Sequence, residues 1–375
     1  MKTLKLSLIA AIAASGISVA NAQDLASAIK NVEVSGTVVY RYNDYEPSTS
    51  TTNYYKLATS LKSKINNDVT FNSRFIAGDG TTDPISLNTS TSADKNIDIQ
   101  LTEVNFTYTG LANTAITLGK QAISSPFTIT RSSIGDEQVG TGIAATTSIG
   151  DTTFTAAYFN QTNFATSGNA TSLYAGNEGA DLIHVGVKTS IAGVNLDAHY
   201  ADSVDIFDAY TLGLNTSGNI SDVKLSAFAR YSELDLDDSD KKNSLWKVGV
   251  KASTGIYGAF LAYGQTHKDG GVVGLDDGAD VGFDEHWRVT LTGISDASTV
   301  YASINAQVTE KLNLALKYSD LDAGDNSSSV DQTETYLQAS YKMSSNFKGY
   351  LRFGELDKDG SETATIGRLN IQYSF

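Results

Sequence analysis

The chain has no cysteine, only three prolines and few charged residues. Among its 375 residues are 32 glycines and 19 tyrosines, and charged side chains make up 18% of the total, below the roughly 25% typical of soluble domains. The lack of cysteine excludes a disulfide scaffold and any cysteine-bound metal centre. The formal charge of −15 argues against nucleic acid as a partner, because proteins that bind it carry basic surfaces.

Long apolar runs are also missing. Beyond the first 22 residues, no stretch approaches the roughly 18 apolar residues that a transmembrane helix requires. The N-terminus has two lysines, a short apolar run over residues 6–17 and a small-residue motif that contains Ala20 and Ala22. This order is typical of a secretory signal peptide, and the apolar run is too short for a membrane anchor. We predict a cleaved signal peptide over residues 1–22 and a mature domain over residues 23–375.

The rest of the chain alternates apolar and polar residues with a period of two. Residues 34–42 are the clearest case: Val34, Val38 and Tyr40 share one phase, and Thr37 and Arg41 share the other. Such alternation predicts half-buried β-strands. The apolar phase is built from Ala, Gly, Val, Leu and Tyr, and the polar phase carries most of the basic residues. A lipid-facing shell with aromatic girdles around a water-filled lumen accounts for both phases, and a soluble β-sandwich is the alternative.

Short turns and long polar connections alternate between these segments. Eight short turns and nine long loops, among them residues 202–206, would join 18 strands. We assign one further apolar stretch, residues 286–293, to a loop, because a single-chain bacterial barrel has an even number of strands. If the weak segments near Tyr55 or Ile206 fail to form strands, the number falls to 16. The sequence therefore predicts an all-β, integral, multi-pass antiparallel barrel in the bacterial outer membrane.

The last segment, residues 366–375, alternates strictly and ends the chain on an aromatic residue. Tyr373 and Phe375 lie on its apolar phase, and Arg368 lies on its polar phase. This ending resembles the outer-membrane insertion signal of bacterial barrels, so we assign Tyr373 and Phe375 to assembly. Closure of the barrel requires the last strand to pair with the first, at residues 33–42. That pairing would place Arg368 and Arg41 together in the lumen.

Three segments resemble the major outer membrane porins of Campylobacter-like bacteria. They are residues 28–44 (AIKNVEVSGTVVYRYND), residues 102–128 (TEVNFTYTGLANTAITLGKQAISSPFT) and residues 139–159 (VGTGIAATTSIGDTTFTAAYF). The resemblance covers the first half of the chain and its C-terminal end. It implies an 18-stranded, trimeric general porin. It also implies calcium at the pore, although the sequence contains no strict calcium-binding loop, so Ca²⁺ is a hypothesis and no other cofactor is expected.

Residues 122–138 follow the fifth predicted strand, where the constriction loop of trimeric porins folds into the lumen. Mixed charges on such a loop, opposite basic wall residues, would create a transverse field that favours small hydrophilic solutes. The alternative is that Arg131 and Asp136 pair with each other in a solvated loop. The residues that we predict to line the pore or its constriction are Arg41, Arg74, Arg131, Asp136, Glu137, Arg352 and Arg368.

No pattern typical of an enzyme is visible. The four histidines are scattered and form no metal or triad motif. Carboxylates cluster at residues 235–240 and 276–285, but neither cluster has the ligand spacing of an EF-hand. Solvated outer loops account for both clusters.

The leading functional prediction is a general diffusion porin that transports small hydrophilic solutes and ions, with a weak cation preference from its acidic mouth. Its expected partners are outer-membrane lipid, lipopolysaccharide and two further copies of the chain in a homotrimer. An adhesin or structural barrel that acts through its long surface loops is the first alternative. An outer-membrane lipase is the second, although it would need a serine and a histidine brought together on the outer side.

Overall fold

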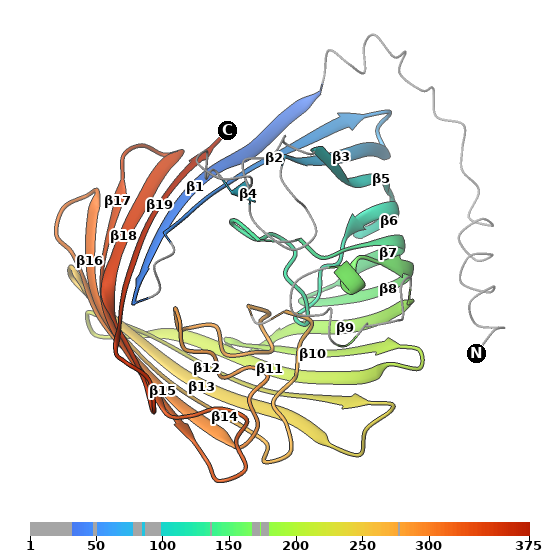
Figure 1. Cartoon of the computed structure of the whole chain (residues 1–375). Helices are drawn as coiled ribbons and strands as arrows, with labels where there is room; N and C mark the ends of the chain where they lie inside the picture. The colour runs from blue at the N-terminus through green and yellow to red at the C-terminus, as the bar shows by residue number, and fades with distance from the viewer. Residues whose placement is uncertain are drawn as a thin grey trace.

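A computed structural model describes residues 32–47, 51–77, 85–86, 99–135, 137–166, 173, 180–276 and 278–375. The predicted signal peptide, with Ala20 and Ala22, and the predicted pore residue Asp136 lie outside these residues. The described chain forms one closed antiparallel sheet, seen as a ring of strands in Figure 1. Of its 19 strands, β4 (Ile85–Ser86) has two residues and pairs only with the outer part of β2. The remaining 18 form the wall, so the predicted strand number is confirmed.

The first nine wall strands are β1 (Glu33–Glu46), β2 (Thr52–Lys64), β3 (Val69–Ala77), β5 (Ile99–Leu111), β6 (Thr114–Ala122), β7 (Val139–Ile149), β8 (Thr152–Thr162), β9 (Leu182–Ile191) and β10 (Val194–Ser203). The other nine are β11 (Phe207–Ile220), β12 (Val223–Leu236), β13 (Lys242–Thr254), β14 (Tyr257–Thr266), β15 (Ala297–Gln307), β16 (Leu312–Ala323), β17 (Gln332–Lys342), β18 (Phe347–Lys358) and β19 (Ala364–Ser374). A single 3-10 turn, η1 (Phe164–Thr166), is the one helical element in the described part of the chain, and no helix there could span a membrane.

The connections separate into two classes, as the sequence predicts. Turns at one end of the barrel are short, for example residues 192–193 between β9 and β10. The longest connection at the other end joins β14 to β15 over residues 267–296. It contains the apolar stretch 286–293, which is therefore confirmed as part of a loop.

One predicted long connection, residues 202–206, is wrong. Ser203 still belongs to β10 and Phe207 already begins β11, so only three residues join the two strands. Asp202 and Asp208 lie opposite each other in the β10–β11 ladder, and the Tyr200 hydroxyl is within hydrogen-bonding distance of both carboxylates. Their polarity suggests a loop in the sequence, but in the structure they occupy the outward face at the rim.

The seam between β1 and β19 closes the barrel. Its register runs from Thr37 opposite Ser374 to Glu46 opposite Thr365, and Gly36 and Phe375 exchange two backbone hydrogen bonds of 2.8 and 3.0 Å. The predicted pairing of the first and last strands is confirmed. Its register is shifted along β1 from the expected residues 33–42, because strands in a barrel are tilted and staggered. A Cβ atom at position 36 would lie 2.6 Å from the Phe375 ring, so glycine is required there.

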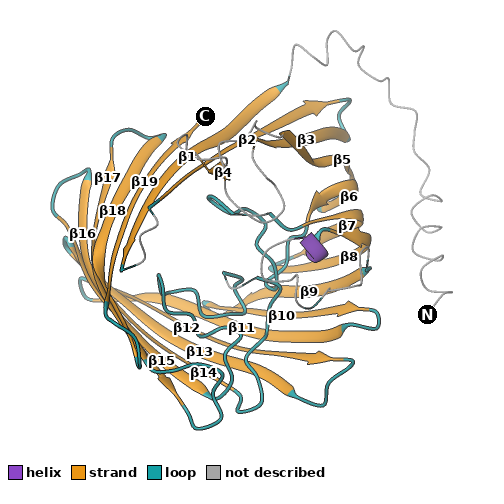
Figure 2. Ribbon diagram, viewed as in Figure 1, coloured by secondary structure: helices purple, strands orange, loops and turns teal. Residues whose placement is uncertain are grey.

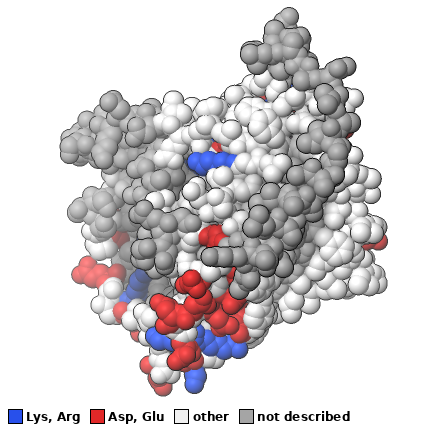
Figure 3. Space-filling view, turned by 90° about the vertical axis from the view of Figure 1, so that its right-hand side faces the viewer, with Lys and Arg blue, Asp and Glu red and all other residues white. Residues whose placement is uncertain are grey.

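The outward phase of the wall is an exposed apolar band. Its exposed members include Val38, Leu118, Leu212, Val250, Leu261, Ile304, Leu337 and Leu351. Exposed aromatic side chains, such as Tyr200, Trp246 and Tyr318, lie toward the strand ends that carry the long loops. In Figure 3 charged residues gather at the lower end, and the described wall above them is almost uncharged. An apolar band edged by aromatic rings is what a lipid bilayer requires.

Candidate functional site

Two loops fold into the lumen and meet there. They are residues 123–138, between β6 and β7, and residues 267–296, between β14 and β15; Figure 2 shows both inside the ring of strands. The Leu275 N–H donates to the Phe127 carbonyl oxygen at 2.8 Å, and the Val281 N–H donates to that of Pro126 at 3.1 Å. The Gln138 amide donates to the Leu275 carbonyl oxygen at 2.6 Å. We call these segments the first and second inner loops; together they form one partition across part of the lumen.

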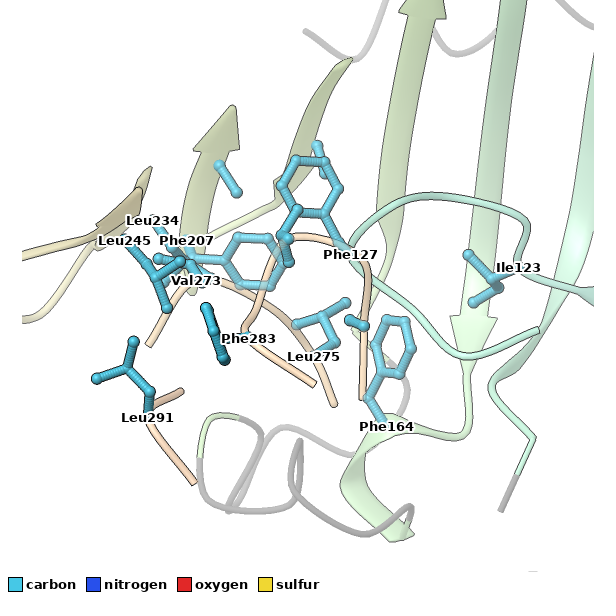
Figure 4. Close-up of a cluster of buried hydrophobic side chains, with 14 of the residues drawn as sticks. Ile123, Phe127, Phe164, Phe207, Leu234, Leu245, Val273, Leu275, Phe283 and Leu291 are labelled. Carbon is cyan, nitrogen blue, oxygen red and sulfur yellow. The ribbon is translucent and has the colours of Figure 1, made fainter. Parts of the chain in front are cut away.

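A hydrophobic cluster fastens the partition to the wall (Figure 4). The first inner loop contributes Ile123 and Phe127, and the second contributes Val273, Leu275, Phe283 and Leu291. Phe207, Leu234 and Leu245 from β11–β13 and Phe164 from η1 complete the part shown. Each fully buried side chain of this size stabilises the packing by about 1.5–3 kcal/mol. The inward fold of the first loop is confirmed. The expectation of a solvated outer loop over residues 276–285 is wrong, because the second inner loop turns into the lumen and buries its apolar side chains in this cluster.

A buried carboxylate anchors the first inner loop. Arg74 donates from Nε and Nη2 to the two oxygens of Glu137, both at 2.7 Å, and Lys56 Nζ lies 3.0 Å from Glu137 Oε1. Burial raises the pKa of the Glu137 carboxyl, but the Arg74 hydrogen bonds and the charges of Lys56, Arg74 and Arg131 outweigh it, so the net shift is downward. The Glu137 side chain has no exposed surface. Glu137 therefore holds the loop from behind and does not line the open lumen.

Arg131 is the exposed basic residue of this loop. Its guanidinium pairs with Glu103 at 2.5 Å and lies 3.5 Å from Glu137, and its side chain remains 45% exposed. The alternative pairing with Asp136 lies outside the described residues. Arg131 therefore presents a positive charge at the partition, while its carboxylate partner Glu103 comes from the wall strand β5.

A second buried carboxylate, which the sequence did not single out, anchors the second inner loop. Glu334 on β17 accepts the backbone N–H groups of Trp287 and Arg288 at 2.8 and 2.7 Å, and the Ser319 hydroxyl at 3.1 Å. Glu334 has no exposed surface. The only available sequence signal is that Glu334 is an acid on the lumen phase of a wall that is otherwise mainly basic.

Replacing Glu334 with alanine is expected to loosen the second inner loop. The change leaves two enclosed backbone N–H groups without an acceptor, at about 1–3 kcal/mol for each. Limited proteolysis of the protein in intact outer membranes should then cut within residues 267–296 faster than in the wild type. Glu310→Ala, at an exposed turn, is the control; equal cutting of all three proteins would contradict the assignment.

The other predicted wall arginines gather on three adjoining strands. Arg41 lies on β1, Arg368 on β19 and Arg352 on β18, with Arg352 directly opposite Arg368. The predicted proximity of Arg41 and Arg368 across the seam is confirmed in the register. Arg74 is not part of this group, because Glu137 engages it on β3. In each of the three arginines Nε donates to a side-chain amide oxygen: Asn370 for Arg41 at 3.0 Å, Gln338 for Arg352 at 2.8 Å and Asn43 for Arg368 at 2.7 Å.

Two histidines that are separated in the sequence come together in the wall. His184 on β9 and His199 on β10 stack with ring centroids 5.2 Å apart, and His184 Nε2 lies 3.1 Å from His199 Nδ1. No hydroxyl contacts either ring among the described hydrogen bonds, so the pair lacks a nucleophile. Strand pairing, which the spacing of residues does not reveal, brings them together.

A calcium site does not fit the described carboxylates. Across the described ranges, no group of three or more His, Asp or Glu side chains converges in a way that could hold a metal ion. Asp280 of the second inner loop instead pairs with Arg230 at 2.7 Å, and Asp276 accepts the backbone N–H of Gly278 at 3.0 Å. No role for Ca²⁺ is therefore derived.

The comparisons with known proteins agree with this architecture. OpdK from Pseudomonas aeruginosa superimposes with a TM-score of 0.76 at 12% identity, over 92% of this chain and 99% of that one. OccK5 (OpdH) from the same organism superimposes with a TM-score of 0.73 at 14% identity, over 92% of this chain and 98% of that one. OprD from the same organism superimposes with a TM-score of 0.71 at 15% identity, over 95% of this chain and 99% of that one. At such identities the likeness shows the fold alone.

At the level of sequence, no curated protein matches the chain. Residues 1–178 do match a family model, that of the Campylobacter major outer membrane protein. This match confirms the resemblance seen in the first half of the sequence. The chain is therefore an outer-membrane β-barrel whose residues 1–178 match the Campylobacter major outer membrane protein family.

Proposed function

We propose that the chain is a general diffusion channel that passes small hydrophilic solutes and ions across the outer membrane. The observation that carries this proposal is the partition formed by the two inner loops, each fixed by a buried carboxylate to a polar wall. Such a partition narrows the lumen, and a lumen lined by charged and amide side chains favours hydrophilic over apolar solutes.

We further propose that the ion preference is weakly toward cations. The second inner loop exposes carboxylates, among them Asp280, whose side chain is 64% exposed, and Asp284. Lys224 and Lys251 of the wall line one hollow together with Glu285 of this loop. Charges of opposite sign along one path partly cancel for small ions, so the net preference should be small.

Planar-bilayer recording tests both statements. Purified, folded protein should give discrete conductance steps in KCl, and a KCl gradient should give a small reversal potential of the sign for cations. Folded protein without conductance steps would refute the diffusion channel. A reversal potential of the opposite sign would refute only the cation preference.

The signal peptide, the trimer and the lipopolysaccharide contact are proposals that rest on the sequence. Support for a lipid environment comes from the exposed apolar band. The trimer is what the resemblance of the sequence to Campylobacter-type porins implies. Chemical crosslinking of intact outer membranes should give a trimer band. N-terminal sequencing of that material should begin at Gln23.

A further inference from the structure

We propose that Arg41, Arg352 and Arg368, with Trp287 beside them, form a binding site for small carboxylate solutes on the pore wall. We call this group the arginine cluster. The inference rests on the proposed function, because a solute reaches this wall only through an open channel.

The cluster concentrates positive charge without a carboxylate. Arg352 and Arg368 face each other directly across β18 and β19, and Arg41 lies on the next strand. Like charges directly opposite each other destabilise a sheet. Within the described ranges, no ion pair joins any of the three to Asp or Glu. The nearby carboxylate of Glu334 is already engaged by two backbone N–H groups and Ser319.

Neutral groups hold the guanidinium groups in place. Each Nε donates to an amide oxygen, as described above, and Arg368 Nη2 donates to the Tyr45 hydroxyl at 2.8 Å. Arg41 Nη2 donates to the Ser133 hydroxyl of the first inner loop at 3.2 Å. These contacts orient the side chains but leave their charge uncompensated. The N–H groups that remain form a rigid fork of the kind that binds a carboxylate in a bidentate manner.

Aromatic rings stack on the cluster. The Cζ atoms of Arg352 and Arg368 each lie 5.4 Å from the Trp287 ring, and that of Arg352 lies 4.7 Å from the Tyr350 ring. Stacking on ring faces leaves the edges of the guanidinium groups, where the N–H groups are, available for a ligand. The indole N–H of Trp287 is enclosed and has no acceptor among the described residues. An unpaired enclosed donor is unfavourable. Because this atom has almost no accessible surface, a carboxylate oxygen would accept from it only after the ring shifts.

There is space for a solute beside the cluster. A hollow of about 510 Å³ reaches the cluster at Arg41, whereas Arg352, Arg368 and Trp287 lie outside its lining. Its other lining residues include Ser133, Tyr350, Lys311, Lys342 and Lys348, and among the described residues the one acid in the lining is Glu310. The three lysines lie at the short-turn end of the barrel. Positive charge therefore continues from the cluster toward that end, which attracts anions and gives them a path away from the site.

The test compares benzoate with benzamide, its neutral isostere. In wild-type proteoliposomes we expect benzoate to enter faster than benzamide and to block the KCl current at lower concentration. In R352Q/R368Q the benzoate concentration for half-block should rise by about tenfold or more, the loss expected when a charged hydrogen-bonding pair is removed. K224Q/K251Q removes two charges from the lumen face of β12 and β13 and should leave the half-block concentration within about twofold of the wild type.

R41Q provides a second measurement. Arg352 and Arg368 also contact Trp287 and so brace the second inner loop, whereas the contacts of Arg41 among the described residues do not include that ring. A folded R41Q barrel should also bind benzoate more weakly. Equal entry of benzoate and benzamide into wild-type liposomes that conduct KCl would overturn the carboxylate site. An equal rise of the benzoate half-block concentration in K224Q/K251Q and in R352Q/R368Q would also overturn it. That result would show that benzoate responds to the general positive charge of the lumen and not to a specific site. Absence of KCl conductance in the wild type would instead refute the diffusion channel.

Discussion

Replacing Glu137 with alanine is expected to release the first inner loop from the wall and to raise the single-channel conductance. Removing one partner of a buried ion pair leaves an uncompensated charge, at about 3–5 kcal/mol. Here Arg74 would lose both of its carboxylate contacts. Lys56 would keep its bonds to the carbonyl oxygens of Ser132 and Gly135, both at 2.9 Å, but would lose the carboxylate. Because the wall has its own ladder of hydrogen bonds, the barrel should persist while the loop moves.

Glu33→Ala is the matched control, because Glu33 also pairs with a lysine. Its contact with Lys62 spans 4.0 Å between exposed side chains, and such pairs contribute little. Bilayer recordings should show larger or more variable conductance steps for E137A and unchanged steps for E33A. Identical steps in both variants would show that the hydrophobic cluster and the remaining hydrogen bonds hold the loop without Glu137.

Acidification of the wild type should produce the conductance change expected for E137A, but only at low pH. The folded-state pKa of Glu137 lies below its ordinary value, so the anchor contributes its full stability above the unfolded-state pKa of about 4.3. This contribution is lost as the pH falls through the lowered folded-state value. Wild-type conductance recorded in steps from neutral pH downward should therefore stay constant until the pH is below about 4.3. A transition near neutral pH would contradict this role.

Deleting Phe375 is expected to impair assembly in the outer membrane much more than it alters the conductance of the molecules that insert. The residue supplies two closing hydrogen bonds to Gly36, and its ring stacks on Tyr373 at 5.9 Å between centroids. It lies far along β19 from both inner loops, so the partition should be unchanged. The amount of heat-modifiable barrel in outer-membrane fractions measures assembly, and bilayer recording measures conductance.

Two substitutions separate the contributions of Phe375. Phe375→Ala keeps the backbone bonds and removes the ring, so its assembly defect should be smaller than that of the deletion. Phe353→Ala removes an equally apolar outward ring away from the seam and should assemble normally. Normal assembly of the deletion variant would show that the seam closes without its last residue.

Much of the fold was predictable from the sequence because it depends on the local alternation of residues and on the even number of strands that a closed barrel requires. A period of two decides which side chains share a face, and so it placed Arg41, Arg352 and Arg368 in the lumen. The even number of strands placed residues 286–293 in a loop. The requirement that every backbone group in lipid be paired joined β1 to β19. The match of residues 1–178 to a family agrees with the resemblance seen in the same half of the chain.

The tertiary structure alone decided how the lumen is divided. The period-two alternation and the even number of strands indicate which face of the wall a residue occupies. They do not indicate which residue, distant in the sequence, its side chain contacts. The contact of Glu137 with Arg74, the hold of Glu334 on Trp287 and the hydrogen bonds between the two inner loops all join segments that are far apart in the chain. For this reason the sequence by itself identified a charged, water-filled barrel. Only the fold showed that Glu137 is an anchor behind the partition and that three arginines without carboxylate partners remain on the pore wall.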